Sequence, residues 1–312
     1  MLHGGMASLD LAGAAPDIDR DYSGRAGYEA AFLGGGVEVP LPRADGRRLT
    51  PGALSVTLKY HQFSIRLHRR RKLAAFAAIN IDGALRTVHA DRSDGVWEID
   101  PRAPDDQCRQ PAYRMPFLRA PLVAASDVGW GGERRAVLGA ADTVHSSNCV
   151  PLHAQLYRNW WSGLEERVLE VAPVLDARLS VFAGPVLHPR DPLLREVQVP
   201  LAYWKVVAWR ERGYGLRSLG LLLRQDAPLR DAIDASAQIP GVRLDPELPD
   251  QPERARGYHA AVGRIALMTG LHFGELATEA VDGYAHQPPA LMAKQLAPGL
   301  RALRSLKDLA VS

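Results

Sequence analysis

The sequence is poor in cysteine and has no long apolar run. Only two cysteines occur in 312 residues, Cys108 and Cys149, and they lack the Cys-x-x-Cys spacing typical of a zinc site. Two such cysteines exclude a disulfide-rich scaffold and favour a reduced compartment. No apolar stretch reaches the roughly 18 residues that a transmembrane helix needs, and the first residues lack the features of a signal peptide. We therefore expect a cytoplasmic protein with no membrane partner.

The chain also carries little excess charge. Its 38 lysines and arginines exceed its 35 acidic residues by three, and the pI is about 8.9. A mildly basic protein is compatible with a nucleic-acid partner, although this charge is not diagnostic. Residues 1–25 are rich in Gly, Ala and Asp, which predicts a loose N-terminal tail. We expect residues 26–312 to form a single domain.

A basic hairpin is the first clear structural pattern. Phe63, Ile65 and Leu67 alternate with polar residues, and a mostly apolar run follows at 73–81, so the sequence predicts two paired strands. The tip between them holds Arg69, Arg70, Arg71 and Lys72. Such a cluster is either a solvated turn or a contact for the phosphate backbone of nucleic acid.

Further patterns mix strands with helices. Strands are predicted around 179–183, over 197–208 and over 215–223, and a helix over Tyr258–Thr269 ending at Gly270. Residues 290–309 have helical periodicity. Because regular βαβ alternation is missing, these elements indicate an α+β fold.

The stretch Asp142–Leu169 is the centre of the chain's candidate chemistry. It predicts a strand end, a turn and then an amphipathic helix, with Asn148 before the helix and Glu165 inside it. Tyr157, Trp161 and Glu165 are spaced by four residues, so they are expected on one helix face. Trp161 is expected to pack in the core.

Several segments, taken in order, resemble the DNA/RNA non-specific endonuclease family, the Serratia-nuclease-like ββα-metal (His-Me finger) enzymes. The order of the motifs carries the resemblance more than any single motif does. The main segments are Asn80–Gly83, Gly129–Gly131, Asp142–Pro151, Trp161–Glu165, Ser180–Val186, Trp204–Val207 and Thr269–Gly274.

The resemblance implies a central, mostly antiparallel sheet flanked by helices, and hydrolysis of nucleic acid with one Mg²⁺. In the family, the His of an Asp-Arg-Gly-His motif is the general base, and the Arg of that motif helps neutralise the phosphate. An Asn on the helix and several waters hold the metal, and a Glu two turns later orders the metal's waters. These roles suit a hard cation and a base that titrates near neutral pH.

Some family positions are retained and four are changed. The motif Arg falls on Arg119 and the helix Glu on Glu165. Asn148 matches an asparagine beside the family's site, which makes it a candidate for weak Mg²⁺ binding. The changed positions are Leu118 for the motif Asp, Ala120 for the Gly, Pro121 for the catalytic His, and Tyr157 for the metal-binding Asn. Proline cannot accept a proton, and a protonated phenol is a poor Mg²⁺ ligand.

Three functions follow from this pattern. The favoured one is a family protein that binds DNA or RNA through Arg119 and the basic hairpin tip but has lost most or all phosphodiester hydrolysis. The second is an active Mg²⁺-dependent nuclease whose base has moved to His145 or His153, although both are expected to be structural. The third is a structural or regulatory protein that binds a protein partner.

Overall fold

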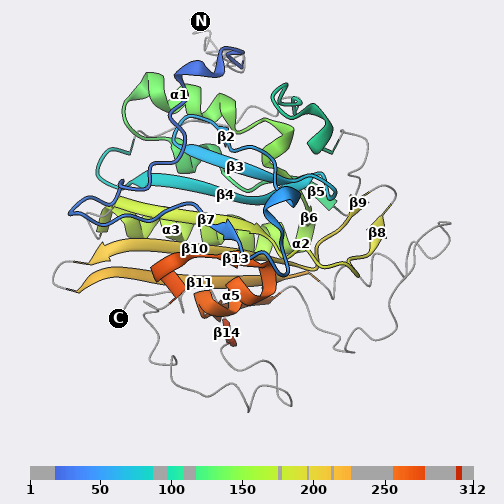
Figure 1. The fold of residues 1–312 in the computed structure, drawn as a ribbon. Coiled ribbons are helices and arrows are strands. Elements are labelled where there is room, and N and C mark those ends of the chain that lie inside the picture. Colours follow the sequence, from blue (N-terminus) through green and yellow to red (C-terminus); the bar gives the residue numbers. More distant parts are fainter. Residues whose placement is uncertain are drawn as a thin grey trace, which may run out of the picture.

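The computed structural model of the chain describes residues 18–86, 97–108, 117–174, 178–194, 197–211, 214–225, 256–277 and 300–303. Its centre is an eight-stranded sheet in which every strand runs antiparallel to its neighbours (Figure 1). In spatial order the strands are β14 (Leu300–Leu303), β12 (Arg256–Ala260), β11 (Gly215–Arg224), β10 (Ala202–Glu211), β7 (Arg178–Pro185), β4 (Leu73–Asp82), β3 (Phe63–His68) and β2 (Leu58–Lys59).

Both faces of this sheet are covered. All ten residues of β4 are buried, which explains its nearly continuous apolar sequence. On one face, Ile65 and Ile79 pack with residues of the helix that carries Trp161 and Leu164. On the other face, Phe182, Trp204 and Ile265 share a second cluster with the helix α5 (Val262–Thr269) (Figure 1).

Shorter elements surround the sheet. Three two-stranded ribbons pair β1 (Arg43–Ala44) with β13 (Leu271–His272), β5 (Phe117–Pro121) with β6 (Cys149–His153), and β8 (Leu193–Leu194) with β9 (Val197–Gln198). The remaining α-helices are α1 (Glu133–Asp142), α2 (Ala154–Leu156) and α3 (Ser162–Val174), and the π-helical turn η7 (Tyr157–Trp161) joins the last two. The 3₁₀ turns include η1 (Tyr22–Gly24), η5 (Ala125–Val128) and η6 (Ser146–Asn148). No helix among the described residues is long and apolar enough to cross a membrane.

The structure confirms the basic hairpin, the α+β class, and the strands at 179–183 and 215–223. It also confirms that the helix α5 ends at Gly270, whose φ of 70° is the left-handed conformation that glycine adopts readily. Three boundaries were wrong. Tyr258 lies in β12, residues 197–208 divide between β9 and β10, and Leu300–Leu303 form a strand although a helix was predicted there.

The segment Asp142–Leu169 is also built differently from the prediction. Asp142 ends α1, Asn148 ends η6, and the strand β6 follows Asn148 before the helical part begins. The expected tail is described only from residue 18. Within it, Arg25 is 4% exposed and its side chain pairs with Asp142, so the last residues of the expected tail belong to the folded body.

Candidate functional site

The two strands β5 and β6, followed by α2, η7 and α3, form a β–β–α unit beside the sheet (Figure 1). In the register of the two strands, Arg119 lies opposite Pro151 and Pro121 lies opposite Cys149. Residues 118–121, which correspond to the Asp-Arg-Gly-His motif of the resemblance, therefore all lie on β5. Leu118 and Arg119 are half-buried, and Ala120 and Pro121 are buried.

Pro121 ends β5 at the position that the resemblance assigns to the general base. Proline has no ionisable group and no N–H, so this position can neither take a proton nor donate a backbone hydrogen bond. The ladder continues without it, because the next N–H, that of Leu122, donates to the carbonyl of Asn148 at 3.0 Å. Proline is tolerated at a strand end for this reason.

The Asn148 side chain is fully buried and bonded to backbone on every side. Its Oδ1 accepts from the Val123 N–H at 3.0 Å, and its Nδ2 donates to the carbonyls of Val123 and Thr143, both at 2.9 Å. Both amide hydrogens are therefore used, and the oxygen is 0% exposed together with the rest of the residue. These contacts fit a residue that fixes two loops, and they engage both the oxygen and the nitrogen of the amide with backbone groups.

His145 is buried with both ring nitrogens engaged. Its Nδ1 lies 2.8 Å from the carbonyl of Asp142, so Nδ1 carries a proton and donates. Its Nε2 then accepts from the hydroxyl of Tyr22 at 2.9 Å. Burial lowers the pKa of His145, which favours the neutral ring. The basic nitrogen of that ring, Nε2, is already used in the hydrogen bond from Tyr22.

His153 ends β6 and caps α2. Its Nδ1 accepts from the Gln155 N–H at 3.2 Å, and its ring meets the edge of Phe117 with centroids 5.7 Å apart. The basic nitrogen of the neutral ring is therefore the one that satisfies the helix N-terminus. To act as a general base through Nδ1, His153 would have to lose its hydrogen bond from the Gln155 N–H.

The helix of the unit is not uniform. Tyr157–Trp161 form a π-helical turn, and such turns insert an extra residue into a helix and shift the faces on either side of it. Tyr157 remains half-buried against the core cluster, while Trp161 is 0% exposed, as expected for core packing. Glu165 lies one turn further along, 6% exposed.

Glu165 belongs to a buried charge cluster that sequence reasoning missed. Lys205 of β10 places its Nζ 3.7 Å from Glu165 Oε1 and 4.9 Å from the centroid of the Trp161 ring. Asp127 of η5 adds a second carboxyl, buried and anchored by the Ala124 N–H at 2.9 Å. Burial, reinforced by the charge of Asp127, raises the pKa of Glu165 to about 8, although Lys205 opposes the shift. The signal was present in the sequence as a lone lysine inside an apolar strand.

The donors at this site do not fit the family's Mg²⁺. A hard cation needs several oxygen ligands, and usually keeps waters as well. Here the Asn148 amide is hydrogen-bonded to backbone groups, Tyr157 stands where the resemblance expects the metal-binding asparagine, and Glu165 already faces an ammonium group. Among the described residues, no group of three or more His, Cys, Asp or Glu side chains could hold a metal ion.

The four residues of the hairpin tip lie in different surroundings. Arg71 is buried and donates to Asp191 Oδ2 at 2.5 Å and to the carbonyls of His188 and Gln198 at 2.9 Å. Arg69 is half exposed and pairs with Asp106 at 3.0 Å. Arg70 and Lys72 are exposed. The prediction that all four could contact phosphate is therefore wrong for Arg71, whose charge is paired inside the protein.

Arg119 and the hairpin tip lie at the same end of the sheet. Arg71 binds the carbonyl of Gln198, and the Gln225 amide donates to the carbonyls of Pro200 and Pro151, at 2.6 and 3.3 Å. Pro151 is the register partner of Arg119. Within the part of the chain that the structure describes, the guanidinium of Arg119 makes no hydrogen bond or ion pair. The charged groups of Arg70, Lys72 and Arg119, which lie at this end of the sheet, are therefore available to a ligand.

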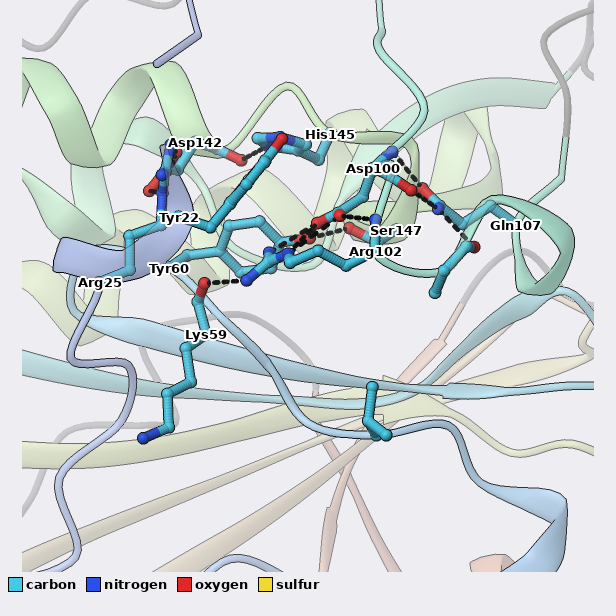
Figure 2. Close-up of polar contacts among 12 residues, drawn as sticks. Tyr22, Arg25, Lys59, Tyr60, Asp100, Arg102, Gln107, Asp142, His145 and Ser147 are labelled. Carbon is cyan, nitrogen blue, oxygen red and sulfur yellow. Dashed lines mark hydrogen bonds and ion pairs between the residues drawn. The ribbon is translucent and has the colours of Figure 1, made fainter. Parts of the chain in front are cut away.

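A second polar network fixes the loops around His145 (Figure 2). Two guanidinium groups lie over the Tyr22 ring, that of Arg25 at 4.2 Å and that of Arg102 at 4.0 Å from the ring centroid. The Arg102 guanidinium also lies 4.8 Å from the centroid of the Tyr60 ring. Two buried carboxylates, Asp142 and Asp100, neutralise these two arginines. Burial alone would raise the pKa of Asp100, but hydrogen bonds from Arg102 and Tyr60 hold it below its usual value. None of these residues was singled out from the sequence for this role.

Comparison with known proteins agrees with this geometry. The model of the DNA/RNA non-specific endonuclease family matches residues 48–251, which is more than half of the chain. The uncharacterized protein y4fB of Sinorhizobium fredii (strain NBRC 101917 / NGR234) is 30% identical over 307 residues, covering 92% of this chain but 43% of that protein. This chain therefore spans less than half the length of that relative.

A solved structure shares the fold. A chain in the crystal structure of the EndoG/EndoGI complex, described as revealing the mechanism of EndoG inhibition, superposes with a TM-score of 0.50 and 16% identity, covering 71% of this chain and 85% of that chain. The β–β–α unit, the antiparallel sheet and the matched sequence lead to one conclusion: the chain belongs to the DNA/RNA non-specific endonuclease family.

Proposed function

We propose that this protein binds nucleic acid through the site of its family and has lost most or all phosphodiester hydrolysis. One observation carries the proposal. Pro121 occupies the position of the general base on β5, and the two nearby imidazoles expected as substitutes use their basic nitrogens in hydrogen bonds within the protein. General-base assistance contributes about 10²–10⁴-fold to such reactions, so its loss alone would remove most activity.

The state of the metal position adds to this argument. Phosphodiester hydrolysis in this family is metal-dependent, and the metal stabilises the charge that develops on phosphate. In this chain the amide of Asn148 and the carboxyl of Glu165 already have protein partners. Tyr157 stands where the resemblance expects the metal-binding asparagine. An active nuclease would need both a new base and a new set of ligands.

Binding does not require the lost groups. Arg119, Arg70 and Lys72 lie at one end of the sheet, and cations arranged in this way bind the phosphate backbone by displacing its counterions. Such contacts position a nucleic acid without reading its sequence. We therefore expect DNA and RNA to bind with little sequence preference and with strong salt dependence.

A single assay tests both halves of the proposal. A fluorescently labelled single-stranded oligonucleotide and its duplex are titrated with the protein in Mg²⁺ at several salt concentrations, and the same samples are then separated on a denaturing gel. The proposal predicts salt-dependent anisotropy changes with intact oligonucleotide. No binding at low salt would overturn the binding half and would favour a protein partner. Cleavage products would overturn the other half.

A further inference from the structure

A second candidate site lies outside the β5–β6–α3 unit. An open hollow of about 420 Å³ is lined by the end of η1 and Ala26, by the β2–β3 turn at His61 and Gln62, and by the first turn of α1 with Arg134 and Arg135. This volume is within the range of about 300–1,000 Å³ that small-molecule sites occupy. None of the residues assigned above to the family site lines it.

The imidazole of His61 is held at the edge of this hollow by a buried carboxylate. Asp142 Oδ2 lies 2.7 Å from His61 Nδ1 and accepts the His61 backbone N–H at 2.9 Å. Asp142 is itself fixed by Arg25, whose Nε and Nη2 donate to it at 2.8–3.0 Å. Burial alone would raise the pKa of Asp142, but hydrogen bonds from His61 and Arg25 hold it below its usual value.

This arrangement fixes the chemistry of the imidazole. Because the Asp142 carboxylate can only accept, His61 Nδ1 carries a proton and donates to it. The other nitrogen, Nε2, lies across the ring from Asp142, and the side chain is 19% exposed. Nε2 is therefore the ring nitrogen that a ligand in the hollow can contact.

Two arginines supply positive charge at the hollow. Arg134 and Arg135 are exposed and line the hollow, and the Arg135 guanidinium lies 5.0 Å from the centroid of the Trp130 ring. Glu133 also lines the hollow and is its one carboxylate among the lining residues. Two guanidinium groups therefore face one carboxylate at this hollow, and they can bind phosphate oxygens in pairs.

Gln62 gives an independent indication of a ligand. It is one of two described non-glycine residues with a left-handed backbone, at φ 69°, and such strain concentrates at functional sites. Gln62 is among the residues that line the hollow, and it is only 2% exposed. Nε2 donates to the carbonyl of Trp130 at 2.8 Å, whereas Oε1 has no partner among the described residues. An unpaired buried acceptor is costly, and a hydroxyl or amino group of a ligand would satisfy it.

We propose that this hollow binds a phosphate group that is attached to a hydroxyl- or amino-bearing small unit, as in a nucleotide. In this site Arg134 and Arg135 bind the phosphate, His61 is oriented by Asp142 and presents Nε2 to the ligand, and Gln62 accepts from the attached unit. The ligand is either a free nucleotide or the terminal phosphate of a nucleic-acid chain. The site does not depend on the family cleft, so it can exist whether or not that cleft binds nucleic acid.

Calorimetric titration of the full chain tests this proposal with five probes. These are inorganic phosphate, adenosine 5′-monophosphate, adenosine, a trinucleotide with a 5′-phosphate, and the same trinucleotide without it. We expect the monophosphate to bind with a Kd of about 10 µM to 1 mM, corresponding to about 4–7 kcal/mol, and adenosine to bind at least tenfold more weakly. A trinucleotide that binds only with its 5′-phosphate, and more tightly than the monophosphate, would identify a chain end as the source.

Variants separate this site from general charge effects. The double variant Arg134→Ala/Arg135→Ala should weaken monophosphate binding by at least about tenfold, since it removes two charge-assisted contacts, and Arg134→Lys/Arg135→Lys should restore part of it. The control Arg47→Ala/Arg48→Ala removes the same charge at exposed positions outside both proposed sites and should leave the Kd unchanged. Equal weakening in both alanine variants, equal binding of adenosine, or no binding of phosphate or monophosphate would each overturn the proposal.

Discussion

Asn148 is tied to Val123 at both ends of its amide. Its Oδ1 accepts the Val123 N–H at 3.0 Å, and its Nδ2 donates to the Val123 carbonyl at 2.9 Å. A third bond, to the Thr143 carbonyl, joins this pair to the end of α1. The asparagine that the family resemblance places beside a metal therefore serves here as a connection between the segment after β5 and the segment before β6.

Replacing Asn148 should affect stability and not metal binding. Asn148→Ala leaves three buried backbone groups without partners, and we expect it to reduce the free energy of unfolding by about 2–4 kcal/mol. Urea denaturation with and without Mg²⁺ at matched ionic strength measures both effects. Our account would be contradicted by a variant as stable as the wild type in metal-free buffer that has lost a Mg²⁺-dependent stabilisation.

The two neighbouring arginines of the hairpin tip should behave in opposite ways. Arg71→Ala leaves the buried carboxylate of Asp191 unpaired, and loss of one member of a buried ion pair costs about 3–5 kcal/mol. Arg70→Ala, at an exposed position, should change stability by no more than about 0.5 kcal/mol. Thermal unfolding of the two variants side by side measures this difference, and similar melting temperatures would contradict the assigned contacts.

Glu165 should make stability depend on pH in a particular direction. Burial raises its pKa from 4.5 to about 8 in the folded chain. The folded chain then binds more protons than the unfolded chain between these values, so this contribution to the free energy of unfolding decreases as the pH rises from 4.5 to 8. Glu165→Gln cannot ionise and should gain stability relative to the wild type by about 1–3 kcal/mol between pH 5 and pH 8.

Urea denaturation of both proteins at the two pH values measures this gain. Titrating groups that do not interact with Glu165, including His145, whose pKa is lowered by burial, are present in both proteins and cancel in the difference. A variant that is less stable than the wild type by the same amount at both pH values would contradict the raised pKa, because it would show that Glu165 is ionised throughout and stabilised by Lys205.

Nucleic-acid binding should follow the available cations. Arg119→Ala and Arg70→Ala/Lys72→Ala should weaken binding of DNA and RNA to a similar extent for all sequences, and the removal of each cation that binds a phosphate should reduce the slope of log K against log salt by about 1. Fluorescence anisotropy at four salt concentrations measures the slopes. Unchanged slopes in both variants would place the nucleic-acid surface elsewhere.

Local sequence patterns predicted the strongly apolar elements well. The alternation of Phe63, Ile65 and Leu67 and the ten buried residues of β4 have one stable arrangement, a hairpin with both faces covered. Gly270 ended α5 where a left-handed residue was needed. By contrast, the conformation of Leu300–Leu303 depended on pairing with β12, and that pairing overrides a local helical period.

The candidate site was less accessible to sequence reasoning. The loss of the base at Pro121 could be predicted from the sequence alone, because a proline side chain cannot accept a proton in any structural environment. The roles of Arg71, Asn148 and His61 could not, because each depends on a partner far along the chain, at Asp191, at Val123 and at Asp142. The local sequence does not distinguish an exposed arginine from a buried one, because burial depends on an ion-pair partner elsewhere in the chain.

Cleavage of supercoiled plasmid, with the protein in excess and with Mg²⁺ or Mn²⁺ supplied, tests the central claim most directly. The account predicts that the plasmid stays supercoiled while the protein shifts its mobility, and that His145→Ala and His153→Ala give the same result. Nicked or linear plasmid at a rate that exceeds a metal-free control, and that disappears on replacement of His145, His153 or Asn148, would contradict it.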